Sequence, residues 1–219
     1  MNIFNIKQGH TMYYELATLT LPFGTTAQAA QNVQAYTSDA AAGGELLGCW
    51  YSDIGQLNQL LVLRGFDSLA ALEAEQQRTR LSADPYGCGS LATSIDRQAY
   101  QAFPWMAPLR PSSESGISGP VYEIRTYGIK TGGLQHTMDL WQEYLPPRSA
   151  LSPCLVAMFA LQGPLRFTNI WAYASVDERS RIRGEAVAAG IWPPKGGPAW
   201  LTTDMHSTIA LPTAVSPLK

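Results

Sequence analysis

The sequence has few cysteines and no long apolar run, and neither sign of charge predominates. Its three cysteines, Cys49, Cys88 and Cys154, lie far apart and lack any CxxC spacing, which argues against a disulfide framework and a zinc site. We therefore expect no metal, and the free thiols favour the reducing cytoplasm. No stretch approaches the roughly 18 uncharged apolar residues that a membrane span requires, so we expect no membrane partner.

The charged residues and glycines exclude further classes of function. The formal net charge is -2, from 15 Lys and Arg against 17 Asp and Glu, which provides neither a basic surface for nucleic acid nor an acidic tail. The glycine pairs lack the phosphate-binding fingerprint that follows a strand, so no nucleotide cofactor is expected. No Ser-His-Asp, Cys-His or metal-ligand arrangement can be argued. The sequence leaves open whether the protein is an enzyme.

A repeated motif organises the rest of the chain. Residues 13–21 (YYELATLTL) recur in more regular form 108 residues later as residues 121–129 (VYEIRTYGI), and Gly24 corresponds to Gly132 in the same way. The alternation of residue types, rich in Tyr, Leu and Thr, predicts a strand in each copy. We infer that one structural unit was duplicated and then diverged.

Each copy predicts the order strand, helix, strand, strand, helix, strand, which is the split βαβ or ferredoxin-like arrangement of the α+β class. The expected strands are residues 13–21, 45–52, 57–66 and 90–101, then 121–129, 154–161, 165–174 and 205–211. The expected helices are residues 27–42, 69–81, 132–144 and 176–188.

The chain is expected to divide into two domains. The first covers residues 12–108 and the second residues 120–219, and a linker at residues 109–119 lies in a stretch rich in turn-forming residues. Residues 1–11 precede the repeat, and we interpret them as a leader that comes either from a vector or from an upstream start.

The second copy resembles the NIPSNAP domain. Residues 122–127 (YEIRTY) are similar to a YELRTY strand, and residues 169–173 (NIWAY) with 175–179 (SVDER) are similar to the hairpin and helix start that follow it. The first copy is weaker, because Ala17, Val62 and Arg64 stand where the pattern has Arg, His and Trp.

This resemblance implies a fold and no reaction. NIPSNAP proteins resemble the dimeric α/β-barrel superfamily, in which two ferredoxin-like units place their sheets face to face and enclose a cavity. The two copies can form that barrel inside one chain or between chains, so a homo-oligomer is also an expectation.

Strand alternation assigns one face of each strand to the barrel interior. We expect the helices to cover the more apolar face, with Tyr122, Ile124 and Thr126, which leaves the alternate residues of the strand inside the barrel. The ligand-binding candidates are these inward residues, their counterparts on neighbouring strands and a histidine of the closing strand: Glu15, Arg64, Glu123, Arg125, Tyr127, Asn169, Trp171, Tyr173 and His206.

Two interpretations of the arginines stay open. Arg64 and Arg125 each share the expected barrel wall with a glutamate. Arginine suits bidentate contact with the carboxylate of a ligand, but glutamate and arginine also neutralise each other as a buried pair. The leading hypothesis is a protein that binds a small organic molecule in the barrel cavity, as a cofactor-independent catabolic enzyme. The alternative is a non-catalytic oligomeric scaffold that contacts another protein.

Overall fold

The computed structural model describes residues 12–116 and 119–219, so the leader assigned to residues 1–11 lies outside the described residues. The strands are β1 (Tyr13–Thr20), β2 (Glu45–Ile54), β3 (Gln59–Phe66), β4 (Ser94–Ala102), β5 (Val121–Ile129), β6 (Cys154–Ala160), β7 (Arg166–Tyr173) and β8 (Leu201–Pro212). The helices are α1 (Thr26–Thr37), α2 (Leu69–Leu81), α3 (Ser112–Ser115), α4 (Gly133–Ser149) and α5 (Val176–Ala188), with the short 3₁₀ turns η1 (Pro85–Gly87) and η2 (Gly197–Trp200).

The strands close into one barrel in the order β1-β3-β2-β8-β5-β7-β6-β4, and the paired neighbours are antiparallel. Each half of the chain supplies four adjacent strands, and the halves meet where β2 pairs with β8 and β4 with β6. The predicted α+β fold of two ferredoxin-like units is therefore confirmed. Both units of the barrel come from a single chain.

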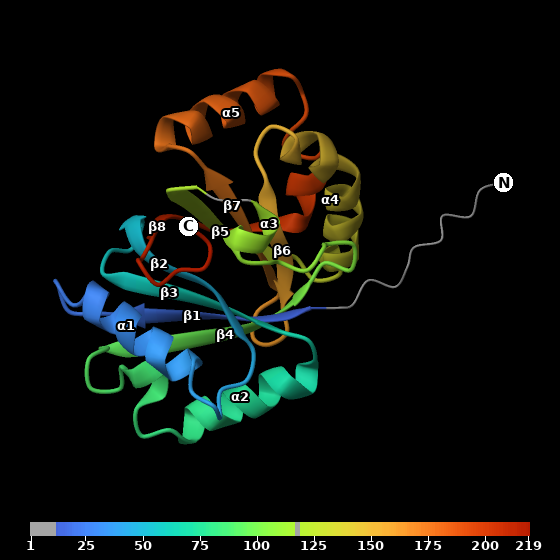
Figure 1. Ribbon diagram of the computed structural model, residues 1–219. Helices are drawn as coiled ribbons and strands as arrows, with labels where there is room; N and C mark the ends of the chain where they lie inside the picture. Colours follow the sequence, from blue (N-terminus) through green and yellow to red (C-terminus); the bar gives the residue numbers. More distant parts are fainter. Residues whose placement is uncertain (1–11, 117–118) are drawn as a thin grey trace.

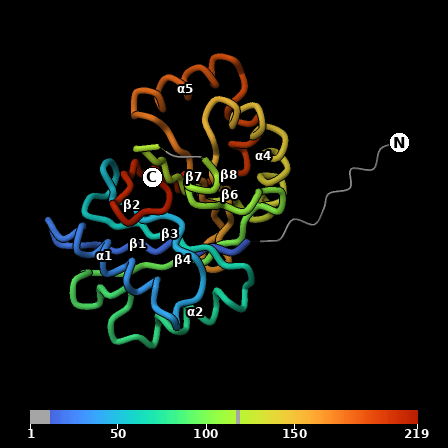
Figure 2. The backbone as a smooth tube through the Cα atoms, viewed as in Figure 1, coloured from blue at the N-terminus to red at the C-terminus, as the bar shows by residue number. Residues whose placement is uncertain are grey.

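The helices lie outside the barrel. Helices α1 and α2 cover the first unit, and α4 and α5 cover the second, on the opposite side of the molecule (Figure 1). Figure 2 follows the same path from blue to red and shows the two units stacked on each other. Ser68 and Ser175 begin the second helix of each unit in the same way, because each side chain accepts a hydrogen bond from a backbone N–H three residues later. Among the described helices, none combines the length and apolar content needed to cross a membrane.

The barrel interior holds the largest apolar cluster. Tyr14, Leu16, Leu63, Tyr122 and Ile124 belong to it, together with residues from the other strands. Separate clusters lie between the sheet and the helices, where Ala17 and Leu19 pack under α1 and Trp171 packs beside Trp141 of α4.

This arrangement corrects the predicted faces, which are inverted. The side chains expected inside the barrel face the helices instead: Glu15, Arg64, Glu123, Arg125, Tyr127, Asn169, Trp171 and Tyr173. The physical reason is that both faces of these strands are buried, one by the closed barrel and one by the helices, so the more polar face need not be the inner one. Glu15, Arg64 and Glu123 are fully buried under the helices, where each has a polar partner.

One end of the barrel is filled by segments that follow each unit. The backbone N–H of Leu109 donates to the hydroxyl of Tyr14 at 3.1 Å, and the N–H of Leu218 donates to the carbonyl of Leu47 at 3.1 Å. All four residues are buried in the interior cluster. Part of the segment expected to be a linker thus packs against the barrel, and the two-domain division stays a prediction.

Candidate functional site

A cavity of about 490 Å³ opens at the other end of the barrel. Strand β1 runs from the filled end of the barrel to the open end. Tyr14 lies at the filled end, and Leu16, Thr18 and Thr20 follow along the cavity wall. The cavity is lined by residues of β1, β3 and β4, of the turn between β2 and β3, and of β5, β7 and β8: Leu16, Thr18, Thr20, Gly55, Gln56, Gln59, Leu61, Ser94, Asp96, Gln98, Tyr100, Ile124, Thr126, Arg166, His206, Ser207 and Thr208. Its volume is in the range of small-molecule sites.

The cationic group of this cavity is Arg166, at the start of β7. Its guanidinium donates from Nη2 to the side-chain oxygen of Gln98, and its Nε is buried with no hydrogen-bond partner among the described residues. The Gln98 amide is itself held by the carbonyls of Ala99 and Gln162. Within the described part of the chain, no carboxylate lies at ion-pair distance from Arg166. Arg166 can therefore donate to a ligand.

A chain of hydroxyl groups crosses the cavity wall beside this arginine. The hydroxyls of Thr126 and Thr168 are 2.7 Å apart, and Thr168 donates to the phenolic oxygen of Tyr100 at 3.0 Å. Burial raises the pKa of Tyr100, so the phenol keeps its proton at neutral pH. Because Tyr100 accepts from Thr168, its own proton can point to a group in the cavity.

His206 lies at the mouth of the cavity, as expected for an inward position on the closing strand. It is paired opposite Thr126 across β5 and β8. Its Nε2 is 2.8 Å from Oδ1 of Asp204, and the two side chains are 76% and 61% exposed. This places the imidazole at the solvated rim of the cavity.

In the second unit, the predicted pair Glu123 and Arg125 lies under α5. Glu123 is fully buried and forms ion pairs with Arg125, Arg179 and, at 3.7 Å, Arg183. Burial alone would raise the pKa of Glu123, but the hydrogen bonds and charges of Arg179 and Arg125 outweigh it and lower the pKa to about 2. The contacts show Arg125 in a buried ion pair with Glu123, and Arg125 does not line the barrel cavity.

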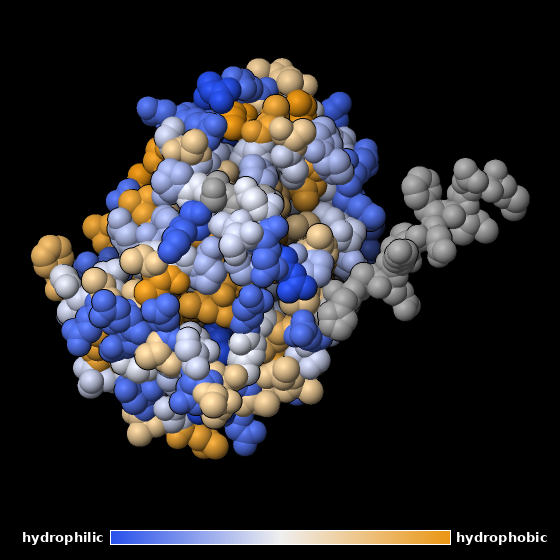
Figure 3. All heavy atoms as spheres, in the orientation of Figure 1, coloured by the Kyte–Doolittle hydropathy of each residue, from blue (hydrophilic) through white to orange (hydrophobic). Residues whose placement is uncertain are grey.

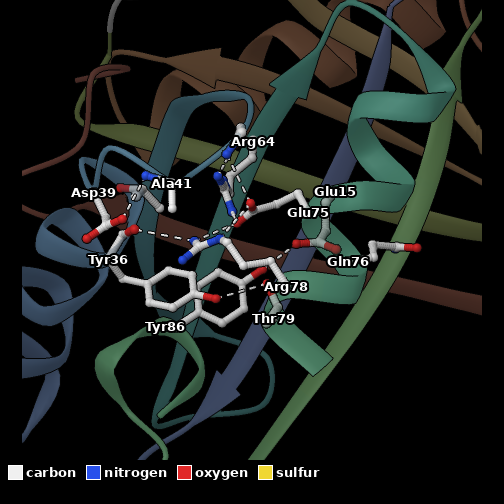
Figure 4. A network of polar contacts seen from close by, with 12 residues as sticks. Glu15, Tyr36, Asp39, Ala41, Arg64, Glu75, Gln76, Arg78, Thr79 and Tyr86 are labelled. Atoms are coloured by element: carbon white, nitrogen blue, oxygen red, sulfur yellow. Dashed lines mark hydrogen bonds and ion pairs between the residues drawn. The ribbon is translucent and has the colours of Figure 1, made fainter. Parts of the chain in front are cut away.

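In the first unit, Arg64 also has a carboxylate partner, but it comes from a helix. Its Nη1 is 2.5 Å from Oε1 of Glu75 on α2, and Arg78 donates to both oxygens of the same carboxylate at 2.8 Å (Figure 4). Glu15 instead accepts a hydrogen bond from the hydroxyl of Tyr86, and both residues are fully buried. The two glutamates of the repeated motif therefore have different partners.

The remaining predicted residues hold the helix layer together. The indole N–H of Trp171 donates to the side-chain oxygen of Asn169 at 2.7 Å, and the guanidinium of Arg148 lies over the Trp171 ring at 4.3 Å. Tyr173 accepts from Arg148 at 3.1 Å and its hydroxyl lies 3.5 Å from Glu123. Only His206 among the predicted site residues lines the barrel cavity.

Sequence reasoning missed Arg166, Tyr100, Gln98 and the two threonines. Arg166 and Thr168 have the same parity on β7 as Ile170 and Ala172, and we expected that face to lie under the helices. Assigning the other set of alternate strand residues to the barrel interior would have included these residues among the candidates. The described residues contain no group of three His, Cys, Asp or Glu side chains arranged to hold a metal ion.

The closed barrel of two ferredoxin-like units around a cavity defines a member of the dimeric α/β-barrel class, here with both units in one chain. The NIPSNAP family model matches residues 14–99 and 122–217, one match in each unit, so the chain belongs to the NIPSNAP family. The resemblance found in the repeated motif is therefore confirmed.

Known proteins agree with this assignment. The chain is 27% identical over 152 residues to Protein NipSnap homolog of Dictyostelium discoideum, a match that covers 68% of this chain and 66% of the relative, just under two thirds of its length. Its fold is similar to that of an anthrone oxidase-like protein (TM-score 0.65, 12% identity, 92% of this chain and 91% of the other). It is also similar to a candidate monooxygenase from Lactobacillus acidophilus (TM-score 0.62, 11% identity, 92% and 93%). At these identities the two solved structures support the fold alone.

Proposed function

We propose that the protein binds a small organic molecule in the barrel cavity and that Arg166 holds the ligand's anionic group. One observation carries the proposal: an open cavity of about 490 Å³ contains an arginine with no carboxylate partner in the described part of the chain. A half-buried guanidinium of this kind is costly to leave unpaired and is suited to a ligand carboxylate.

An aromatic acid suits one part of the lining, which is otherwise mostly polar and includes Asp96. Leu16, Leu61 and Ile124 provide apolar contacts deeper in the barrel, whereas Arg166 and Tyr100 provide donors on one side. A flat apolar body with a carboxylate and a neighbouring hydroxyl or carbonyl oxygen would satisfy both. The volume is large enough for a ligand of two fused rings.

We further propose that the protein is a cofactor-independent catabolic enzyme and that the bound molecule is its substrate. Two proteins with the same fold are named an anthrone oxidase-like protein and a candidate monooxygenase, and the first of these names refers to an aromatic compound. His206, held by Asp204 at the cavity mouth, is the residue placed to take a proton from a ligand hydroxyl. Mass spectrometry of a panel of hydroxylated aromatic acids, incubated with the protein and with His206→Gln, tests turnover separately from binding.

Binding is tested by calorimetric titration with 3-hydroxy-2-naphthoate. Replacing Arg166 by glutamine removes a charged hydrogen bond and should weaken binding by roughly 10- to 100-fold. The matched control is Arg181→Gln, because Arg181 is an exposed arginine on α5 that pairs with Glu185. Equal affinity of wild-type protein and Arg166→Gln, or no binding by a panel of such acids, would contradict the proposal.

The scaffold alternative has less support. We expected a scaffold to fill its barrel with Trp171, Tyr173, Phe66 and Leu19, and these residues lie under the helices instead. The barrel also closes within one chain, so a homo-oligomer would have to use the outer surface. Oligomerisation stays a prediction that sedimentation velocity can test.

A further inference from the structure

A second pocket lies outside the barrel, between the sheet of the second unit and helices α4 and α5. It has a volume of about 240 Å³, and Arg125 and Tyr127 of β5 form part of its wall. Thr126, between them, faces the barrel cavity. Because neighbouring residues of one strand point to opposite faces, the sheet itself separates the two pockets.

The walls of this outer pocket are mostly aromatic and apolar. Trp141 of α4 packs edge-on against Trp192 at 4.9 Å and against Phe167 at 5.1 Å. Pro193 and Pro194 complete this side. At the rim, Val187 of α5 is 61% exposed, and in Figure 3 apolar side chains gather over α5 at the top of the molecule. A ring or a branched alkyl group fits such a surface.

Positive charge exceeds negative charge at the polar end of the outer pocket. Arg125, Arg179 and Arg183 face one carboxylate, that of Glu123, and no Asp or Glu lines the pocket. Arg183 is the least satisfied of the three: its only ion pair is the 3.7 Å contact to Glu123, and it makes no hydrogen bond among the described residues. Burial lowers the pKa of Arg183, and the charge of Arg125 adds to this effect.

The first unit differs in the layer under its helices. There the loop after the second helix inserts Tyr86, whose ring packs on Tyr36 at 5.4 Å and whose hydroxyl donates to Glu15. Glu15 corresponds to Glu123 in the repeat, but Glu123 accepts from Arg125 and Arg179 instead. In the second unit, the segment after α5 contributes Trp192, Pro193 and Pro194 to the wall of the outer pocket.

We propose that this outer pocket binds a small carboxylic acid with an aryl or branched alkyl body, and that Arg183 and Arg125 hold its carboxylate. The anionic group of the ligand supplies the charge that the three arginines lack. At about 240 Å³ the pocket has about half the volume of the barrel cavity, so single-ring acids are the first ligands to test.

The test is ¹⁹F NMR of protein labelled with 5-fluorotryptophan, titrated with phenylacetate, benzoate and 4-methylpentanoate. The six tryptophan signals are assigned by single Trp→Phe substitutions. We expect the signals of Trp141 and Trp192 to move with at least one acid while that of Trp50, inside the barrel, stays unchanged. Phenylacetamide, which is neutral, should move neither.

Two variants identify the site. Arg183→Gln should weaken binding by roughly tenfold or more, whereas Arg181→Gln, two residues away on the exposed side of α5, should leave it unchanged. Leu140→Trp, which fills the pocket from α4, should abolish the shifts. The proposal is overturned if no acid moves either signal or if the amide acts like the acid. It is also overturned if Arg183→Gln and Leu140→Trp both bind the acids as the wild-type protein does. Loss of binding in Arg166→Gln alone would place the ligand in the barrel and also overturn it.

Discussion

The buried carboxylate of Glu123 allows a quantitative prediction about the second unit. The substitution Glu123→Gln keeps the shape of the side chain and removes the charge that faces Arg125, Arg179 and Arg183. The pKa of Glu123 is lowered from an ordinary value of 4.5 to about 2. At about 1.4 kcal/mol per pKa unit, ionised Glu123 contributes roughly 3 kcal/mol to the free energy of unfolding at neutral pH.

The sign of the pH dependence follows from the lowered pKa. The stabilisation is complete above pH 4.5, the ordinary value, and is lost as the pH falls toward the folded-state pKa of about 2. We expect wild-type protein to exceed Glu123→Gln in unfolding free energy by about 3 kcal/mol at pH 7 and by only about 1 kcal/mol at pH 3. Comparing the two proteins at each pH cancels the titration of the other carboxylates.

Urea unfolding followed by tryptophan fluorescence at pH 7, 5 and 3 measures this difference. The control is Glu185→Gln, which removes an exposed carboxylate paired with Arg181 and should cost at most about 0.5 kcal/mol at any of these pH values. A difference below about 1 kcal/mol at pH 7, or one that stays the same from pH 7 to pH 3, would refute the assignment of Glu123 as a charge stabilised by its arginines.

Two further predictions concern the first unit and the packing of the barrel. Tyr86→Phe removes the donor to Glu15, whose other carboxylate oxygen is already without a partner, and should lower the unfolding free energy by about 1–3 kcal/mol; an unchanged urea midpoint would contradict this. Gly48→Ala would place a methyl group 1.9 Å from the ring of Trp50 and should destabilise by about 1–3 kcal/mol, whereas Gly184→Ala, in open space on α5, should stabilise by about 0.5–1 kcal/mol. Equal melting temperatures for the two alanine variants would show that the glycine is not required at position 48.

Much of the fold could be predicted because local signals and the repeat agree. Alternation of residue types located the strands, and the helices expected at residues 69–81 and 176–188 have the same bounds as α2 and α5. The boundaries are less exact: α4 continues through Pro146 and Pro147 to Ser149, beyond the expected end at residue 144. A proline usually ends a helix, so only tertiary packing at this end of α4, where Leu145 and Arg148 are buried, accounts for the extension.

The site was harder to predict, because alternation gives two faces without saying which one lies inside. Both faces of β5 are largely buried, one by the barrel and one by the helices, so apolarity alone does not distinguish them. The partner of Arg64 shows a second limit. Glu75 lies eleven positions away on α2, and no strand register relates the two residues. Arg166 was missed because we assigned its face of β7 to the helices, which placed it outside the cavity.

The central claim is that the open barrel cavity holds a small organic acid against Arg166. The most direct measurement is a crystal structure of the protein grown with 3-hydroxy-2-naphthoate. We predict density for the ring system between Leu16 and Ile124, with the carboxylate within hydrogen-bond distance of the Arg166 guanidinium and an oxygen facing Tyr100. A barrel cavity that holds only water at saturating ligand, or a ligand bound there without contact to Arg166, would contradict the claim.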